Sequence, residues 1–364
     1  MVRGLLITII AITVITFDSS ILLSQSLEEK LSELLEDHAK LYLQPIFNAF
    51  GSTINSGWYH SAGTHKLFGF DISINTSAMA IPDKDKIFKL VAPDFTTTQQ
   101  IGGREYTLSI DSEILYPNRE APTVFGSEKW AEINKTDDVD GIKSLLTLQL
   151  IDQGMDQETA NSSTTQNQLN SIVNSIPNLT SPPGFDLKYF LLPIAQISVG
   201  IAIPMSPIKA EVIARGLPKF ELEDMGEVNL LGFGGRLRLD PFIPIPMFPL
   251  RITAGGFLQN INIGDVLKSQ HIHYGLAVGK DINLITFGFG IYAGYGLEKS
   301  TYEVKYSYSG EGDTSSNTEF KSEGENKSRI IAGVNLRLAL INLSLQYSKS
   351  YYDILTLGIG LSIR

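Results

Sequence analysis

The sequence has 364 residues and a formal net charge of −10; 43% of its residues are hydrophobic, 19% are charged and none is cysteine. The acidic balance argues against nucleic-acid binding, because phosphates require a basic surface. The missing cysteines exclude disulfides, thiol catalysis and an N-terminal lipoprotein anchor. The chain is far too polar for a bundle of transmembrane helices, and its length suits one barrel or two soluble domains.

Residues 1–24 have the three parts of a secretory signal. Arg3 precedes an apolar run over residues 5–17, and a short stretch ending near Ser24 follows the run. The run is too short to span a bilayer by itself. We therefore expect Sec-type export with cleavage, and an uncleaved N-terminal anchor is the alternative.

Residues 25–66 are predicted to begin with an amphipathic helix. A capping-box sequence starts at Ser26, so the helix should run to about Ala39, or at most to Leu43, before Pro45 interrupts it. The remainder is expected to be irregular. In a barrel the apolar stripe would pack in the lumen as a plug, whereas in a soluble protein it would belong to a core helix. The candidate plug residues are Leu27, Leu31, Leu34, Leu35 and Trp58.

Alternation of apolar and polar residues is clearest near the C-terminus. It extends over residues 329–340, 343–347 and 355–363, where Gly, Ser, Thr and Asn dominate the polar face. Strands with one apolar side produce this period of two. The length of the segments is typical of a transmembrane barrel, whose apolar side faces lipid, whereas a soluble sandwich has strands of about five or six residues.

The same pattern begins at residues 67–81 and returns after residue 191, so the predicted fold is all-β. We predict a transmembrane antiparallel β-barrel of about 10–14 strands over residues 67–364, behind an N-terminal helical plug segment. Ten strands can be counted directly, and a hairpin hidden between Lys86 and Tyr116 would raise the number to twelve.

Residues 82–188 interrupt the strand pattern. A structureless insertion of this length would be unusual inside a compact soluble domain, so it is predicted to be a long extracellular loop. Barrels of bacterial outer membranes have short turns on the periplasmic side. We assign residues 204–207, 280–281 and 341–342 to that side, and we place residues 309–328 outside with the insertion.

Several charged residues and histidines fall on the polar faces of the predicted strands. A charge facing lipid near the bilayer midplane would cost about 2–4 kcal/mol, so these side chains should line the lumen. They would either form a salt-bridge network that holds the plug and braces the wall, which we favour, or mark a path for a polar or anionic head group. The candidate lumen-lining residues are Asp71, Lys209, Glu211, Arg215, Arg236, Arg238, His271 and His273.

Two short patterns suggest metals or catalysis without completing a site. His271 and His273 share a strand face and could ligate zinc, and Ser269 precedes them as in a barrel hydrolase, but neither a third ligand nor an acid lies nearby in sequence. Residues 137–141 resemble part of a calcium loop, although Thr136 and Thr147 stand where carboxylates are needed. We therefore predict no catalytic, cofactor or metal site.

Residues 43–50, 55–59, 65–71 and 121–126 resemble an uncharacterised family of Gram-negative outer-membrane β-barrel proteins, with the Asn-Ser-Gly-Trp stretch at residues 55–58 as the most specific part. The resemblance covers nearly the whole mature chain and implies a location in the outer membrane. A plug followed by a barrel is also similar, in architecture only, to the FadL/TodX transporters of long-chain fatty acids and hydrocarbons. No ligand-site motif of those transporters is present.

The expected function is passive transport of hydrophobic or amphipathic small molecules across the outer membrane. The alternative is a structural or surface-interaction barrel that acts through its extracellular loops, and a barrel hydrolase ranks third. The expected partners are outer-membrane lipid and lipopolysaccharide, a hydrophobic small-molecule ligand and the barrel-assembly machinery, without nucleic acid.

Overall fold

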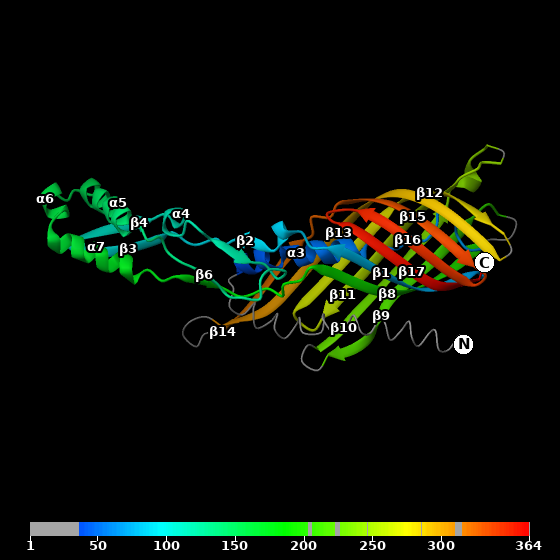
Figure 1. The fold of residues 1–364 in the computed structure, drawn as a ribbon, viewed down its shortest axis with the longest axis horizontal. Coiled ribbons are helices and arrows are strands. Elements are labelled where there is room, and N and C mark those ends of the chain that lie inside the picture. Colours follow the sequence, from blue (N-terminus) through cyan, green and yellow to red (C-terminus); the bar gives the residue numbers. More distant parts are fainter. Residues whose placement is uncertain are drawn as a thin grey trace. The chain divides into compact units, whose positions relative to one another are not determined.

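The computed structural model describes residues 36–202, 206–222, 226–245, 247–284, 286–309 and 315–363 (Figure 1). The predicted signal and the four candidate plug leucines lie outside these residues. The chain divides into two compact units. One consists of the residues up to Pro82 together with Leu187–Arg364, and the other is Asp83–Asp186.

Ten antiparallel strands of the first unit close into a barrel, which confirms the predicted fold class (Figure 1). Each strand pairs with its neighbours in chain order, and the first strand pairs with the last, with Phe70 opposite Ile363. The strands are β1 (Phe70–Ala80), β8 (Tyr189–Ala202), β9 (Lys209–Leu222), β10 (Gly226–Arg238), β11 (Arg251–Ile263), β12 (Leu267–Asn283), β13 (Phe287–Ser309), β15 (Ser328–Leu338), β16 (Ile341–Lys349) and β17 (Asp353–Ile363).

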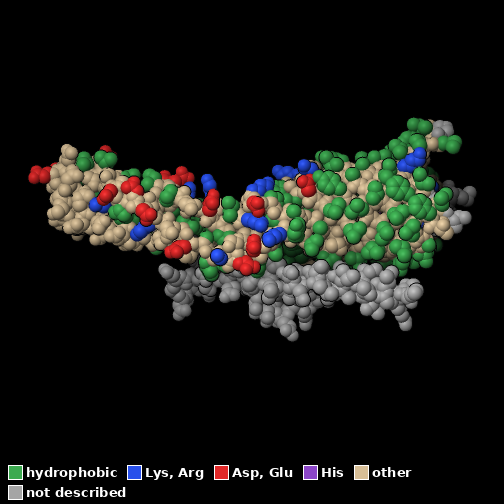
Figure 2. All heavy atoms as spheres, viewed as in Figure 1, with side chains coloured by type: hydrophobic (Ala, Val, Ile, Leu, Met, Phe, Trp, Pro, Cys, Tyr) green, Lys and Arg blue, Asp and Glu red, His purple; other side chains and the backbone are tan. Residues whose placement is uncertain are grey.

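The barrel wall is apolar outside and polar inside. Figure 2 shows hydrophobic side chains over the strands, and every strand contributes at least one exposed large apolar residue. The inward positions carry buried Ser, Asn, Gln, Thr, His, Arg and Glu. This polarity is the reverse of a soluble domain and matches a barrel that faces lipid. The outward residues, one per strand, are Ile72, Ile197, Val212, Phe233, Leu258, Leu276, Ile291, Val334, Leu345 and Leu357.

Two connections differ from the sequence prediction. Residues 341–342 and 280–281 lie within β16 and β12, so the preceding strand β15 ends at Leu338 and β12 continues to Asn283. A further strand, β14 (Ser315–Glu323), pairs with the extended end of β13. The long connection between β10 and β11 contains the 3₁₀ turn η2 (Asp240–Phe242).

The helix α3 (Glu36–Ile54) continues well past the predicted end, so the expected interruption at Pro45 is wrong. A proline removes one helical hydrogen bond and disfavours a helix interior. Tertiary packing overrides this local preference, because Tyr42 and Leu43 before Pro45 and nearly all residues after it are buried. Among the described residues, no helix has the length and hydropathy needed to cross a bilayer.

The Asp83–Asp186 unit is folded, so the prediction of a structureless loop is wrong. The hairpin expected between Lys86 and Tyr116 exists, but it forms a separate two-stranded sheet and adds nothing to the barrel. The elements are η1 (Asp83–Asp85), β2 (Ile87–Lys89), β3 (Phe95–Ile101), β4 (Arg104–Ile110), α4 (Ser112–Leu115), β5 (Glu120–Pro122), β6 (Ala131–Ile133), α5 (Val139–Asp152), α6 (Gln157–Ala160), α7 (Ser163–Ser175) and β7 (Leu179–Ser181).

This unit has its own hydrophobic core. Leu108 on β4, Leu146 and Leu150 on α5, and Leu169 on α7 are all fully buried in one cluster. The acidic residues that resemble part of a calcium loop lie at the start of α5, where the Asp138 carboxylate accepts from the Gly141 backbone N–H at 2.9 Å. Asp138 is therefore a helix N-cap.

We expect Leu146→Ala to destabilise the inserted unit by about 2–5 kcal/mol, because it leaves a cavity in a fully packed core. Hydrogen exchange of the β4 and α7 amides in the full-length protein measures the change. Leu148→Ala, on the same helix but exposed, should leave exchange unchanged. Equal effects of the two variants would contradict the assignment of this core.

Candidate functional site: the plugged lumen

The barrel lumen holds a segment that we call the plug, residues 36–65, consisting of α3 and the irregular residues after it. All residues from 51 to 63 are buried. Trp58, the described member of the predicted plug residues, is 1% exposed, and its ring stacks on Phe257 of β11 with centroids 4.4 Å apart.

Arg215 of β9 holds the C-terminal end of α3. Its guanidinium donates to the backbone carbonyls of Ile54 and Ser56 at 3.1 and 2.9 Å, and to the Gln196 side-chain oxygen at 2.7 Å. It also lies over the Trp58 ring, 3.6 Å from the centroid. Among the described residues no carboxylate pairs with Arg215, so carbonyl dipoles at the helix end and the aromatic face stabilise its charge.

Arg329 of β15 makes an equivalent contact one turn earlier. It donates to the Ser52 carbonyl at 2.5 Å and to the Ser348 hydroxyl at 2.7 Å, and it pairs with Glu298 of β13 at 3.1 Å. The last turn of α3 contains no basic residue of its own. The wall therefore supplies the cations that a helix C-terminus favours.

Arg236 of β10 fixes the irregular part of the plug. It donates to the Ser61 carbonyl at 2.9 Å and pairs with Glu211 of β9 at 2.5 Å, with both side chains fully buried. A buried ion pair is costly unless further hydrogen bonds satisfy its remaining donors. The Ser61 carbonyl accepts from one of them, whereas Arg236 Nε has no partner among the described residues. Three wall arginines thus bind the plug through its backbone.

Aromatic hydroxyls from the wall add further bonds. Tyr292 donates to the Tyr59 carbonyl at 2.8 Å, and Tyr302 donates to the Phe47 carbonyl. Gly57 turns the plug at a φ of +71°, and a Cβ there would lie 2.9 Å from the Thr356 methyl group. Both its backbone conformation and the wall favour glycine at this position.

The predicted lumenal residues divide into two groups. Asp71, Glu211, Arg215, Arg236, His271 and His273 are buried on inward positions of the wall, as the alternation indicated. Lys209 is exposed at the start of β9, and Arg238 pairs with Asp240 of η2. Alternation shows which face of a strand a side chain is on, but it does not show how far along the barrel axis the residue lies. The sequence therefore could not separate Lys209 and Arg238, at strand ends, from residues in the middle of the lumen.

His271 sits in a chain of hydroxyl groups. Its ring nitrogens lie 2.9 Å from the Ser269 hydroxyl and 2.9 Å from the Ser300 hydroxyl, which in turn accepts from Asn326. The predicted proximity of Ser269 and His271 is therefore present. The residue on the far side of the ring is a serine, so the acid of a catalytic triad has no counterpart there.

Arg329, Glu298, His60 and His65 were missed as candidate site residues. Arg329 and Glu298 occupy inward positions of their strands, so the alternation that selected Arg236 could have found them. The two histidines lie in the segment that was expected to be irregular. No periodic signal marks their side chains as buried.

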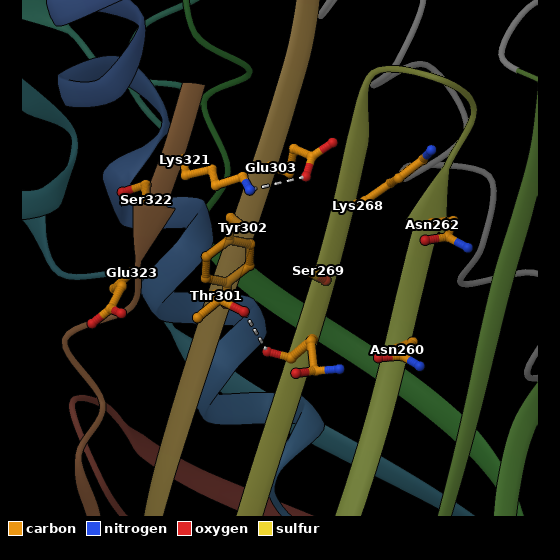
Figure 3. A pocket seen from close by; sticks show the side chains of 11 residues that line it. Asn260, Asn262, Lys268, Ser269, Thr301, Tyr302, Glu303, Lys321, Ser322 and Glu323 are labelled. Carbon is orange, nitrogen blue, oxygen red and sulfur yellow. Dashed lines mark hydrogen bonds and ion pairs between the residues drawn. The ribbon is translucent and has the colours of Figure 1, made fainter. Parts of the chain in front are cut away.

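An open pocket of about 570 Å³ lies on β11, β12, β13 and β14. Figure 3 shows Glu303 and Lys321 turned toward each other there, at an ion-pair distance of 3.9 Å. The lining is dominated by amides, hydroxyls and charges, which suit a polar group better than a hydrocarbon chain. The lining residues are Asn260, Asn262, Lys268, Ser269, Gln270, Thr301, Tyr302, Glu303, Lys321, Ser322 and Glu323.

Comparison with solved structures finds bacterial β-barrels. The β domain of the Bordetella autotransporter BrkA is 13% identical over 48% of this chain and 91% of that domain, with a TM-score of 0.26. The translocator domain of the autotransporter NalP from Neisseria meningitidis is 9% identical over 90% of this chain and 99% of that domain, with a TM-score of 0.24. Neither likeness carries an argument about function.

Among functionally curated proteins, none matches the sequence significantly. A protein family does match, and the match extends over residues 2–363. Its extent covers the plug, the barrel and the inserted unit together. The chain therefore belongs to the family of unknown function DUF6588.

Proposed function

We propose that this protein is an outer-membrane barrel closed by its own N-terminal segment, and that it acts at the cell surface through the Asp83–Asp186 unit. The observation that carries the proposal is the set of bonds from Arg215, Arg236 and Arg329 to backbone carbonyls of the plug. A plug held at three points by buried charges does not leave an open pore.

The apolar exterior of the barrel supports a location in the outer membrane, and so does the predicted export signal. Apolar side chains on every strand would be costly in water and are stabilised in lipid. Insertion would require the barrel-assembly machinery. Lys268 and Lys321 in the polar pocket are suited to phosphate groups such as those of lipopolysaccharide.

The inserted unit connects to adjacent strands. Ala80 of β1 lies opposite Tyr189 of β8, and the Ile81 N–H donates to the Lys188 carbonyl at 3.0 Å. The two ends of the insertion therefore meet at a position where a tight turn would suffice for the barrel. We infer that the unit serves a purpose other than barrel folding, such as binding a surface partner.

Transport of hydrophobic or amphipathic molecules is the second candidate function. The observation in its favour is that the plug is joined to the wall by noncovalent contacts that include the apolar cluster of Trp58, Tyr59 and Phe257. Against it, the buried wall is mostly polar, which would leave a hydrocarbon chain poorly solvated. A catalytic role has less support, because His271 is fully buried.

We expect Arg215→Met to loosen the plug. The variant leaves the Ile54 and Ser56 carbonyls without their donor, and hydrogen bonds from a charged group contribute about 1.5–3 kcal/mol. Amide exchange of residues 52–62 should therefore accelerate by about 10- to 100-fold, and brief openings should occur in planar-bilayer recordings. Lys209→Met, at the exposed end of the same strand, is the control. An open pore in the wild-type protein would contradict the closed-lumen proposal.

We expect protease added to intact cells to cleave within residues 83–186 and to leave the barrel whole. Replacing those residues with a short Gly-Ser turn should preserve membrane insertion and the closed lumen while abolishing binding of any surface partner. Cleavage that requires a permeabilised outer membrane would place the unit in the periplasm and overturn the surface role.

Mass spectrometry of lipids that co-purify in mild detergent separates the two candidate functions. We expect no apolar compound to be enriched over an unrelated barrel, because the lumen is occupied by the plug. One hydrophobic ligand per chain, reduced in a variant without residues 26–60, would instead establish transport.

A further inference from the structure

Three potential metal ligands meet where the plug touches the wall. His60 and His65 belong to the plug, and Glu211 belongs to β9. One donor atom of each lies within 4.8 Å of those of the other two. All three side chains are buried, at 5%, 3% and 1% exposure.

The contacts orient two of these residues. His65 Nδ1 lies 2.9 Å from the Glu211 carboxylate, and its Nε2 lies 3.1 Å from the Ser362 hydroxyl of β17. The second carboxylate oxygen of Glu211 accepts from Arg236. Metal-binding imidazoles and carboxylates are commonly oriented by outer hydrogen bonds such as those to Ser362 and Arg236. A bound metal would replace the direct bond between His65 and Glu211.

Two neighbouring polar atoms have no hydrogen-bond partner among the described residues. His60 Nδ1 is one, and the Asp71 Oδ1 atom of β1 is the other. Asp71 is 1% exposed, and it lies directly opposite Ser362 in the barrel sheet, the residue whose hydroxyl contacts His65. Buried polar atoms are almost always satisfied. Two orphans beside a histidine and carboxylate cluster are an independent sign of a ligand.

We propose that His60, His65 and Glu211 bind a divalent transition metal of the zinc type, with Asp71 as a fourth ligand. Two imidazoles and two carboxylates favour zinc over calcium or magnesium, which prefer oxygen ligands alone. Tetrahedral zinc separates its ligand atoms by roughly 3.4 Å, so the donor atoms of His60, His65 and Glu211, which lie within 4.8 Å of one another, would need to move by only about 1–2 Å. The other oxygen of Asp71, Oδ2, accepts from Asn342 at 3.1 Å, which leaves Oδ1 for the metal. The positive charge of Arg236 reduces the attraction of the site for a metal cation. Its hydrogen bond also holds the Glu211 carboxylate in place.

The bound metal would join the plug to the barrel wall. His60 and His65 are on the plug, whereas Glu211 and Asp71 are on β9 and β1. A ligand that binds only this arrangement stabilises it by mass action. The metal would therefore link the plug to the wall in addition to the hydrogen bonds from the three arginines.

The test uses full-length protein purified in detergent, treated with a chelator and titrated with Zn²⁺. Elemental analysis and a competing zinc indicator should report one tightly held ion per chain. His60→Gln should weaken binding by at least about 10-fold. The ring that it removes has no hydrogen-bond partner at Nδ1 among the described residues, so the barrel should still fold. Zn²⁺ should slow amide exchange of residues 58–65 in the wild type and not in this variant.

His273→Gln is the matched control, because His273 is a buried lumenal histidine outside the cluster. It should retain full zinc binding. The proposal is overturned if the wild type binds no more zinc than His60→Gln, or if His273→Gln loses as much. Asp71→Asn is a second test. If this variant still binds one zinc ion per chain but with lower affinity, Asp71 is supported as the fourth ligand.

Discussion

The structure depends on buried guanidinium groups that meet backbone carbonyls. A helix ends with four carbonyls that have no partner inside the helix, and inside a barrel water is scarce. Arg215 and Arg329 satisfy such carbonyls at the end of α3, while the carbonyls and Glu298 satisfy the arginines. Buried arginines of the wall without hydrogen-bond acceptors would be unstable there, and so would the free carbonyls of α3 without donors. The wall and the plug therefore require each other.

Strand number explains why one chain segment can close the lumen. Barrels of about eight strands have interiors that side chains nearly fill, and wide aqueous channels require sixteen or more. A ten-stranded barrel leaves room for little more than a helix and a short irregular segment. The plug occupies that space with residues that are buried without interruption from 51 to 63.

The inserted unit illustrates how a barrel can carry a second fold. Loops that join adjacent antiparallel strands tolerate insertions when their ends lie close together. β1 and β8 remain paired up to Ala80 and Tyr189, where the insertion begins and ends. The insertion therefore does not shift the register of the barrel strands. The unit has a separate core that includes Leu108 and Leu146. Its stability can therefore vary independently of the membrane barrel.

The sequence by itself determined the barrel and the side of the wall on which most candidate residues lie. Alternation over residues 329–340 predicts β15. The same period puts Glu211, Arg215 and Arg236 on the polar face of their strands, where the structure buries them, because a strand alternates its faces regardless of its neighbours. Local signals failed where packing decides. Pro45 predicted an end to α3, and the mixed pattern of residues 83–186 concealed several short elements around one core.

Only the tertiary structure decided which distant residues meet. Arg329 binds the carbonyl of Ser52 across 277 positions of sequence, and the pairing depends on the depth of the plug in the lumen. His60 and His65 come within reach of Glu211 for the same reason. No period in the sequence records that depth, because it is set by the fit of the whole plug against ten strands.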